Sequence, residues 1–441
     1  MTHIFHRSTQ ATPPRASHGE GIYVIDADGK RYIDACGGAA VSCLGHGDPE
    51  IVAAITTQAQ RLAYAHTSFF TTDAAEDLAD LLIDDAPEGL AKVYFLCDGS
   101  EAIETAVKMA HQYHRERGEP GRHHIIARTQ SYHGNTLGAL SAGGNAWRRA
   151  TYEALMLPAV THIDACHEYR LREPGETSLD YGLRAANLLE AEILRVGPAN
   201  VSCFIAETVG GATLGCVPPV PGYFARIREI CDRYGVLLIL DEVMCGMGRT
   251  GTLHACEQEG VAPDILVIAK GLGAGYVPLG AVLCTGTVYD VFAKGSGTFM
   301  HGHTFVGHPV ACAAALAVQM AVRDRGLVAK VAESGLVLRG ALERTFKDHP
   351  HVGDIRGRGL FHAIELVADR DTKTPFDPAL RVHGAIRREA MSLGLLVYAM
   401  GGTIDGRQGD HILLAPPYTI AHSEIGEIVN RLGQAVAKAV E

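Results

Sequence analysis

The stretch VLLILDEVMCGMGRTG (residues 236–251), followed by DILVIAKGLGAGYVPLGAVL (264–283), decides the fold class of this chain. Each part contains a nearly all-apolar run of strand length, and each run ends at a charged residue, Asp241 in the first and Lys270 in the second. Continuous apolar runs of this length are typical of strands that are buried on both faces. The stretch therefore predicts two neighbouring buried strands whose ends carry an acid and an amine.

Further along the chain in both directions, apolar strands alternate with segments of helical periodicity. Three more strand candidates lie at 93–96, 124–128 and 203–207. The helix candidates are 48–63, 73–86, 100–117, 182–196, 223–234 and 379–393, and one long helical segment is expected over 308–346. Buried strands separated by helices predict an α/β fold with a mostly parallel sheet that helices cover on both faces.

The two ends of the chain follow a different pattern. Residues 21–34 are typical of a β-hairpin, and the C-terminal quarter alternates short polar and apolar stretches around a helix. We therefore expect a large domain over 66–325. A smaller α+β domain would be built from both termini, 1–65 and 326–441.

The composition excludes several classes of function. The chain has 441 residues and a net charge of −11, which gives no electrostatic reason to expect nucleic acid or an anionic membrane as partner. Its 11 cysteines contain no C-x-x-C pair, a pattern that indicates reduced thiols. The start lacks the apolar stretch of a signal peptide, and no run of about 18 apolar residues predicts a membrane helix. We expect a cytoplasmic enzyme that acts on a small metabolite.

Asp241 and Lys270 are the strongest candidates for chemistry. Open α/β sheets bind ligands at the carboxyl ends of their strands, where both residues are predicted to lie. A desolvated lysine loses proton affinity and supplies the neutral amine that attacks an aldehyde. An isolated acid at a strand end more often caps the next element. The functional interpretation therefore depends on Asp241 and Lys270 occurring together, because the two side chains can contact opposite ends of a flat cofactor.

Three further segments fit such a cofactor. Gly99 and Ser100 lie between a strand and a helix, where free backbone N–H groups and a hydroxyl can hold a phosphate. Tyr132 and His133 follow a strand and offer a ring that can stack on a heteroaromatic group. Thr304 offers a hydroxyl in a segment rich in glycine and histidine. Each of these segments is a weak signal when taken alone.

Gly246, Gly248 and Gly251 match the G-x-G-x-x-G fingerprint of nicotinamide cofactors. In a dinucleotide site these glycines directly follow the strand and open a helix. Here residues 242–245 intervene and no helical period follows. A nicotinamide-dependent oxidoreductase is therefore a distant alternative.

Three histidines near Thr304, namely His301, His303 and His308, are candidate metal ligands. Their spacing is not that of a standard zinc site, and neither a cysteine nor an acid lies nearby in the sequence. We expect no metal.

Together these segments resemble the class III aminotransferases, enzymes of fold type I that use pyridoxal phosphate (PLP). The resemblance covers nearly the whole chain, and its core is LILDEVMCGMGRTG followed by APDILVIAKGLGAGYVPLGAV. It implies that Lys270 binds PLP as an aldimine and that Asp241 pairs with the pyridine nitrogen. Glu207 matches the acid that supports the cofactor face.

The resemblance assigns the other cofactor contacts as well. Val243 would pack under the ring while Tyr132 stacks above it. Gly99 and Ser100 would bind the phosphate, and Thr304 would reach the phosphate of the neighbouring subunit's cofactor. The resemblance therefore implies a homodimer, or a tetramer built from such dimers, with active sites at the interface.

The implied reaction is a ping-pong transfer of an amino group. Asp241 would keep the ring nitrogen protonated, and Lys270 would act as the base that moves the substrate Cα proton. Dialkylglycine decarboxylases, aminomutases and racemases share the same lysine and aspartate, so they stay open as alternatives. A non-enzymatic PLP-binding regulator would need a DNA-binding module, for which the chain has no basic domain.

Two departures from the family bear on the substrate. Members that act on ornithine or 4-aminobutyrate carry a glutamate where this chain has Ala212, which weakens the case for such donors. Amine:pyruvate transaminases often have a tryptophan near Ala39-Ala40, so a roomier pocket is expected here.

Arg407 is the candidate for the mobile arginine that binds the keto acid carboxylate in amine:pyruvate transaminases. An exposed loop arginine is the competing interpretation. Tyr64 and His66 are candidates for lining the substrate pocket, with packing in the core an equally open role for either. We expect pyruvate as acceptor and an amine or amino acid as donor.

Overall fold

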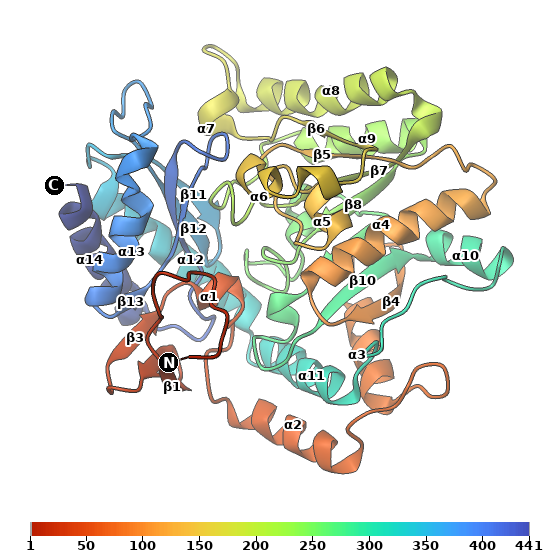
Figure 1. The fold of residues 1–441 in the computed structure, drawn as a ribbon, viewed down its shortest axis with the longest axis horizontal. Helices are drawn as coiled ribbons and strands as arrows, with labels where there is room; N and C mark the ends of the chain where they lie inside the picture. Colours follow the sequence, from red (N-terminus) through yellow and green to blue (C-terminus); the bar gives the residue numbers. More distant parts are fainter. Residues whose placement is uncertain (1, 441) are drawn as a thin grey trace.

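A seven-stranded sheet is the largest unit in the computed structural model, which describes residues 2–440 (Figure 1). In spatial order its strands are β4 (Leu90–Leu96), β10 (Gly280–Thr285), β9 (Ile265–Ile268), β8 (Leu237–Asp241), β7 (Val201–Glu207), β5 (His124–Arg128) and β6 (Val160–Ile163). The strands from β9 to β6 run parallel to one another, and β10 runs antiparallel to β4 and β9. The predicted mostly parallel sheet is confirmed.

Helices cover both faces of this sheet because its strands are apolar on both sides. Leu238 and Leu240 of β8 pack in the same core cluster as residues of α8 and α9, whereas Ile239 between them packs with residues of α4. The helices of this region are α3 (Asp73–Asp84), α4 (Gly99–Glu116), α5 (Leu137–Ala142), α6 (Ala146–Ala150), α7 (Glu168–Leu171), α8 (Ser178–Val196), α9 (Tyr223–Tyr234), α10 (Gly286–Lys294) and α11 (Pro309–Asp324). Burial on both faces explains why these strands lack polar alternation.

The N-terminal strands and the C-terminal region lie side by side (Figure 1). The first small sheet has the order β1 (Ala16–Glu20), β2 (Tyr23–Asp26), β3 (Arg31–Asp34) and β13 (Leu395–Leu396). The second has the order β11 (Val352–Arg358), β12 (Phe361–Leu366), β15 (Asp410–Leu414) and β14 (Tyr398–Gly401). The remaining helices are α1 (Gly37–Ala40), α2 (Pro49–Arg61), α12 (Leu327–Phe346), α13 (Val382–Ser392) and α14 (His422–Val440). Because β13 pairs with β3, the N-terminal hairpin joins the C-terminal region; the domain boundaries themselves stay a prediction.

The structure corrects the sequence-based elements in two places. The single long helix expected over 308–346 is wrong, because Gly326 adopts φ +62° and separates α11 from α12. Strands β6 and β10 were not expected. β6 is a short edge strand that is only partly buried, and β10 follows a glycine-rich turn that hides its start in the sequence. Among residues 2–440, no helix is long and apolar enough to cross a membrane.

Buried histidines make the fold sensitive to acid. Burial lowers the pKa of His254 and His362 to about 4 and that of His411 to about 3. Unfolded histidines bind protons below about pH 6.5, whereas these folded ones stay neutral until the pH falls much further. Protons therefore favour the unfolded state, and stability falls as the pH drops from 6.5 towards 4.

We expect each such histidine to cost about 2 kcal/mol of unfolding free energy between pH 6.5 and pH 5. Urea unfolding at pH 7 and pH 5 measures the loss. His254→Leu should make the loss of unfolding free energy between pH 7 and pH 5 smaller by the contribution of one buried histidine. His422→Leu replaces an exposed histidine and should leave that loss unchanged. Equal losses in wild type and His254→Leu would contradict this account.

Candidate active site

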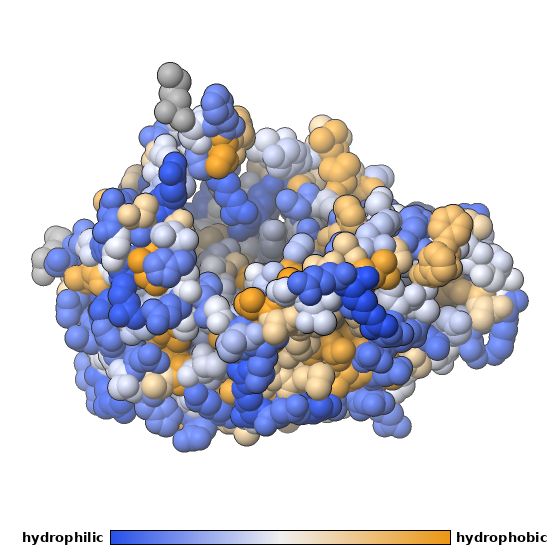
Figure 2. Space-filling view, turned by 90° about the horizontal axis from the view of Figure 1, so that it is seen from below, coloured by the Kyte–Doolittle hydropathy of each residue, from blue (hydrophilic) through white to orange (hydrophobic). Residues whose placement is uncertain are grey.

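Eight of the predicted residues line one cavity of about 610 Å³ at the carboxyl edge of the seven-stranded sheet. A cavity of this size suits a cofactor or a small substrate. In the view from below, hydrophobic side chains stand on both sides of a hollow in the surface (Figure 2). The eight residues are Gly99, Ser100, Tyr132, His133, Glu207, Asp241, Val243 and Lys270.

Asp241 is the last residue of β8, and both oxygens of its buried carboxylate accept hydrogen bonds. Oδ1 accepts from the backbone N–H of Val243 at 2.9 Å, and Oδ2 lies 2.7 Å from Nδ1 of His133. The other ring nitrogen of His133, Nε2, is buried without a partner among the described residues. These contacts fix the orientation of the carboxylate. The link between His133 and Asp241 could not be seen in the sequence, because 108 positions separate the two residues.

Lys270 lies just beyond the end of β9, the neighbour of β8 in the sheet. Its backbone has φ +43°, in the left-handed region that non-glycine residues rarely adopt. Such strain is often found at functional sites, where the surrounding structure holds it in place. Burial lowers the pKa of the Lys270 amine, and the carboxylates of Asp241 and Glu207 act in the opposite direction. The geometry brings a desolvated amine and a fixed carboxylate to adjacent strand ends, as the sequence predicts.

Glu207 ends the third strand of this group, β7, directly beside Asp241 in the register. Its Oε1 accepts a hydrogen bond from the N–H of Tyr132 at 3.1 Å, and its Oε2 accepts one from the N–H of Gly211 at 2.7 Å. Burial raises the pKa of Glu207. The carboxyl group thus holds in place the loops that follow β5 and β7.

Glycines allow close packing of the chain at the N-terminus of α4. A Cβ atom on Gly99 would lie 2.8 Å from Cγ1 of Val243, and a Cβ on Gly134 would lie 2.8 Å from Cα and Oγ of Ser100. Asp98 caps the helix by accepting a hydrogen bond from the N–H of Glu101. The first N–H groups of a helix have no partners within it, so this end can bind an anion.

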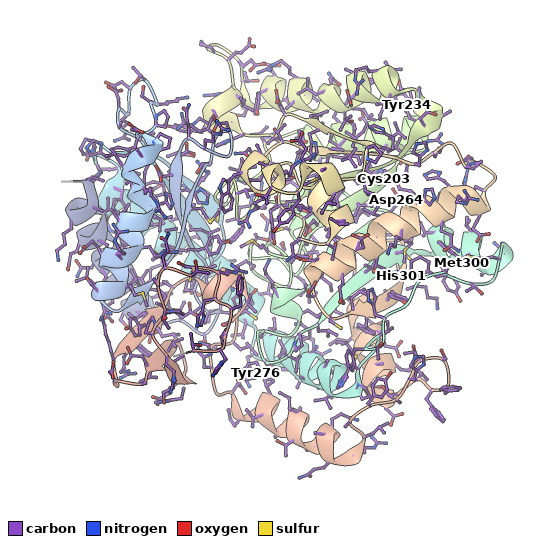
Figure 3. All side chains as sticks on the ribbon, viewed as in Figure 1. Cys203, Tyr234, Asp264, Tyr276, Met300 and His301 are labelled. Carbon is purple, nitrogen blue, oxygen red and sulfur yellow. The ribbon has the colours of Figure 1, made fainter. Side chains whose placement is uncertain are left out.

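Thr304 and Tyr64 lie outside this cavity and contact each other. The hydroxyl of Tyr64 donates to the backbone carbonyl of Thr304 at 2.8 Å, and both residues are exposed. The preceding residues Met300 and His301 lie beside α4 (Figure 3). His301 bonds Thr105 and Met300 bonds Gln112 of that helix, so the segment is fixed against the large sheet unit.

Arg407 and His66 are exposed as well, and neither lines the cavity. The backbone N–H of Arg407 donates to Asp405, while its side chain makes no contact that would hold it in the described residues. The roles expected for Tyr64, His66, Thr304 and Arg407 stay predictions.

Several cavity residues had no signal in the sequence. Arg148 of α6 and Tyr398 of β14 line the cavity although they come from distant parts of the chain, and Arg7 reaches it from the N-terminal segment. Ala39 and Ala212, singled out in the sequence for their bearing on the substrate, also line the cavity. Only the fold brings these segments together.

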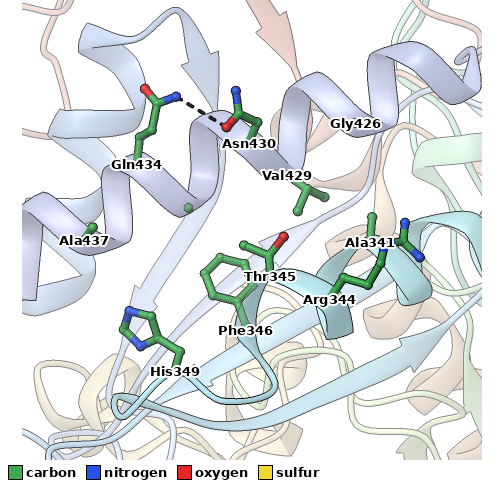
Figure 4. Close-up of a pocket in the computed structure, with 11 residues that line it drawn as sticks. Ala341, Arg344, Thr345, Phe346, His349, Gly426, Val429, Asn430, Gln434 and Ala437 are labelled. Carbon is green, nitrogen blue, oxygen red and sulfur yellow. Dashed lines mark hydrogen bonds between the residues drawn. The ribbon is translucent and has the colours of Figure 1, made fainter.

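A second pocket lies between α12 and α14 (Figure 4). Its lining includes Arg344, His349 and Asn430, but none of the predicted site residues. Within residues 2–440, no group of three or more His, Cys, Asp or Glu side chains is placed to hold a metal ion.

Comparisons with known proteins identify the family. The sequence model of the family described as aminotransferase class-III matches residues 4–436. An uncharacterized aminotransferase of Schizosaccharomyces pombe is 47% identical over 99% of this chain and 95% of its own length.

Two solved structures extend the comparison to the fold. An omega transaminase of Pseudomonas jessenii in complex with PMP has a TM-score of 0.93 at 34% identity, over 100% of this chain and 96% of that chain. A transaminase solved with L-ala has a TM-score of 0.91 at 34% identity, over 97% of this chain and 99% of that chain. The predicted fold type I is confirmed. The chain therefore belongs to the class III aminotransferases, a family of PLP-dependent enzymes that act on small-molecule amines and keto acids.

Proposed function

We propose that this protein transfers an amino group from an amine or amino acid to a keto acid, with PLP as cofactor and pyruvate as acceptor. The observation that carries the proposal is the cavity in which Lys270, Asp241 and Glu207 meet at three neighbouring strand ends. The chain's family and its likeness to a transaminase solved with PMP support the choice of cofactor.

The residues present fit PLP. Gly99 and Gly134 let the chain pack closely against Val243 and Ser100, where a Cβ atom would clash, and the start of α4 suits a phosphate. Asp241 would bind the pyridine nitrogen, Tyr132 and Val243 would contact the ring, and Lys270 would bind the aldehyde carbon. When bound, PLP supplies an aldehyde that combines with amines and a ring that accepts electrons from the substrate Cα.

Lys270 and Asp241 have different roles in the proposed proton transfer. His133 and the N–H of Val243 hold the carboxylate of Asp241 in one orientation. Its negative charge would keep a proton on the pyridine nitrogen of the cofactor. Nζ of Lys270 holds the proton that leaves the substrate Cα, a task suited to an amine whose pKa burial has lowered. The donor product leaves before the keto acid enters the same cavity, so the kinetics are ping-pong.

The cavity supports a donor that is not ornithine-like. Ala212 and Ala39 lie in the lining, where they leave room and supply no charge. Pyruvate as acceptor is supported by the similarity to a transaminase solved with L-ala, since alanine is the product of pyruvate amination.

A half-reaction tests the proposed function. Donor added to the purified holoenzyme without a keto acid should bleach the cofactor's yellow colour in proportion to the enzyme, and pyruvate should restore it with release of alanine. A racemase would show no stoichiometric bleaching with a single amine. Release of carbon dioxide would indicate a decarboxylase instead.

We also propose that the protein is a homodimer in which Thr304 reaches the partner's site. The two segments that the hydrogen bond between Tyr64 and Thr304 joins, 64–70 and 300–305, carry exposed large apolar side chains: Tyr64, Phe69, Phe70, Met300 and Phe305. Phe69 and Met300 are each 78% exposed, which is unusual for large apolar side chains unless they are covered by a partner.

Sedimentation velocity should give a dimer, or a tetramer built from dimers. Phe305→Asp with Phe69→Asp should shift the population towards monomer and lower activity in parallel, because the phosphate contact of Thr304 would be lost. The matched change Leu336→Asp replaces another exposed apolar residue on α12 and should alter neither property. A fully active wild-type monomer would contradict the proposal.

A further inference from the structure

Arg148 is a cationic residue that lines the cavity, and the mechanism proposed above assigns it no role. It lies on α6 and lines the same cavity as Lys270 and Asp241. Of the two arginines in the lining, Arg7 is exposed near the chain terminus, whereas Arg148 is partly buried.

The guanidinium of Arg148 makes no hydrogen bond or ion pair within residues 2–440, and its Nε is buried without a partner. Its neighbour Arg149 provides the contrast, since Nη1 of Arg149 donates to the backbone carbonyls of Ser141 and Gly143 at 2.9 and 2.8 Å. Buried polar atoms almost always have partners, and the chain supplies none to the buried Nε of Arg148. An acceptor from outside the chain, bound in the cavity, would satisfy it.

The protein nevertheless holds Arg148 in a defined place. Oδ1 of Asn145 accepts a hydrogen bond from the backbone N–H of Arg148 at 3.1 Å, and Nδ2 of Asn145 donates to the buried Gln130. Gln130 in turn donates to the carbonyl of Gly402, in the loop between β14 and β15. The start of α6 is therefore tied to two other segments of the fold.

Tyr132 orients the charged end of the side chain. The guanidinium carbon lies 4.6 Å from the centre of the Tyr132 ring, within the range of a cation–π contact. Stacking on a ring leaves the in-plane N–H groups of an arginine free to bind a ligand. The fork of N–H groups thus lies beside a residue that is proposed to contact the cofactor ring.

We infer that Arg148 binds the carboxylate of the substrates, both the amino acid donor and the keto acid acceptor. The inference rests on the proposed function and narrows its substrates to molecules that carry a carboxylate. A guanidinium matches a carboxylate with two parallel N–H···O bonds, which would satisfy the donors that the chain leaves free. Arg407, the candidate from the sequence, lies outside the lining and is exposed.

Arg148→Met tests the inference by removing the fork while keeping an unbranched side chain. Charged hydrogen bonds contribute about 1.5–3 kcal/mol, so KM for pyruvate should rise about 10- to 100-fold. The ratio of KM for alanine to KM for a carboxylate-free amine should rise by a similar factor. Arg148→Lys keeps the charge but not the fork and should fall between wild type and Arg148→Met.

A binding measurement gives a second readout that does not depend on turnover. Propanoate has the carboxylate but no group that can react, so calorimetric titration of the holoenzyme, in which the cofactor fills the phosphate site, reports on the carboxylate contact alone. Its affinity should fall about 10-fold or more in Arg148→Met. Arg195→Met, which removes an exposed surface arginine of α8, should bind propanoate like wild type.

The outcomes separate the two proposals. Unchanged propanoate affinity and unchanged KM for pyruvate in Arg148→Met would overturn the inference while leaving transamination intact. A weaker propanoate affinity and a higher KM for pyruvate in Arg407→Ala, but not in Arg148→Met, would assign the carboxylate contact to Arg407. If the wild type shows no half-reaction with any donor, the proposed function fails, and the propanoate titration still decides on Arg148. If Arg148→Met does not fold, Arg148→Gln takes its place in both measurements.

Discussion

Replacing Lys270 by alanine should abolish transamination, with a loss of at least about 10³-fold in the rate of the half-reaction. The side chain is proposed to supply both the amine that holds the cofactor and the base that takes the Cα proton. No second lysine lines the cavity among the described residues, so nothing there can replace it. Rates with excess PLP measure the loss.

Attachment of the cofactor gives a direct check. Borohydride reduction of the wild-type holoenzyme followed by peptide mapping should place the label on Lys270 alone. Lys270→Arg should carry no label, because a guanidinium does not form the bond with an aldehyde under these conditions, although it keeps the positive charge. Lys294→Ala removes an exposed lysine of α10 and should leave both label and rate as in wild type. A label on any other lysine would overturn the assignment of Lys270.

Asp241→Asn should lower kcat about 10²- to 10⁴-fold while the protein stays folded and retains some PLP. Asparagine keeps the size of the side chain and the oxygen that accepts from the N–H of Val243. It loses the negative charge that would keep a proton on the pyridine nitrogen. The ring would then accept electrons poorly, and the step that removes the Cα proton should slow most.

His133 offers a graded comparison, because its Nδ1 lies 2.7 Å from the Asp241 carboxylate. His133→Ala leaves the charge but frees the carboxylate to rotate, so it should cost less than Asp241→Asn. Asp290→Asn, at an exposed acid on α10, should cost nothing. Stopped-flow mixing of the donor with each holoenzyme measures the rate of the half-reaction, and so distinguishes a slower proton transfer from loss of the cofactor. A rate for Asp241→Asn within about threefold of wild type would contradict the role of the carboxylate.

How far the sequence predicts the fold depends on the environment of each segment. β7, β8 and β9 could be predicted because strands buried on both faces must be apolar throughout, and that composition is visible without the structure. β6 lies at the edge of the sheet and is only partly buried, so its four residues carry little signal. The break between α11 and α12 depends on Gly326, whose φ of +62° is one of several conformations open to glycine.

The sequence by itself determined five of the seven strands of the large sheet, the positions of Asp241 and Lys270 at neighbouring strand ends, and the family. These features depend on local patterns, since a run of apolar residues and the residue that ends it are adjacent in the chain. Only the tertiary structure decided that His133 fixes Asp241, that Arg148 lies in the cavity with a free guanidinium, and that Arg407 does not line it. Those relations join the loop after β5, α6, β8 and the β14–β15 loop. The physical reason is that hydrogen bonds and cavities form between side chains that are close in space, and distance in space is set by the packing of the whole chain.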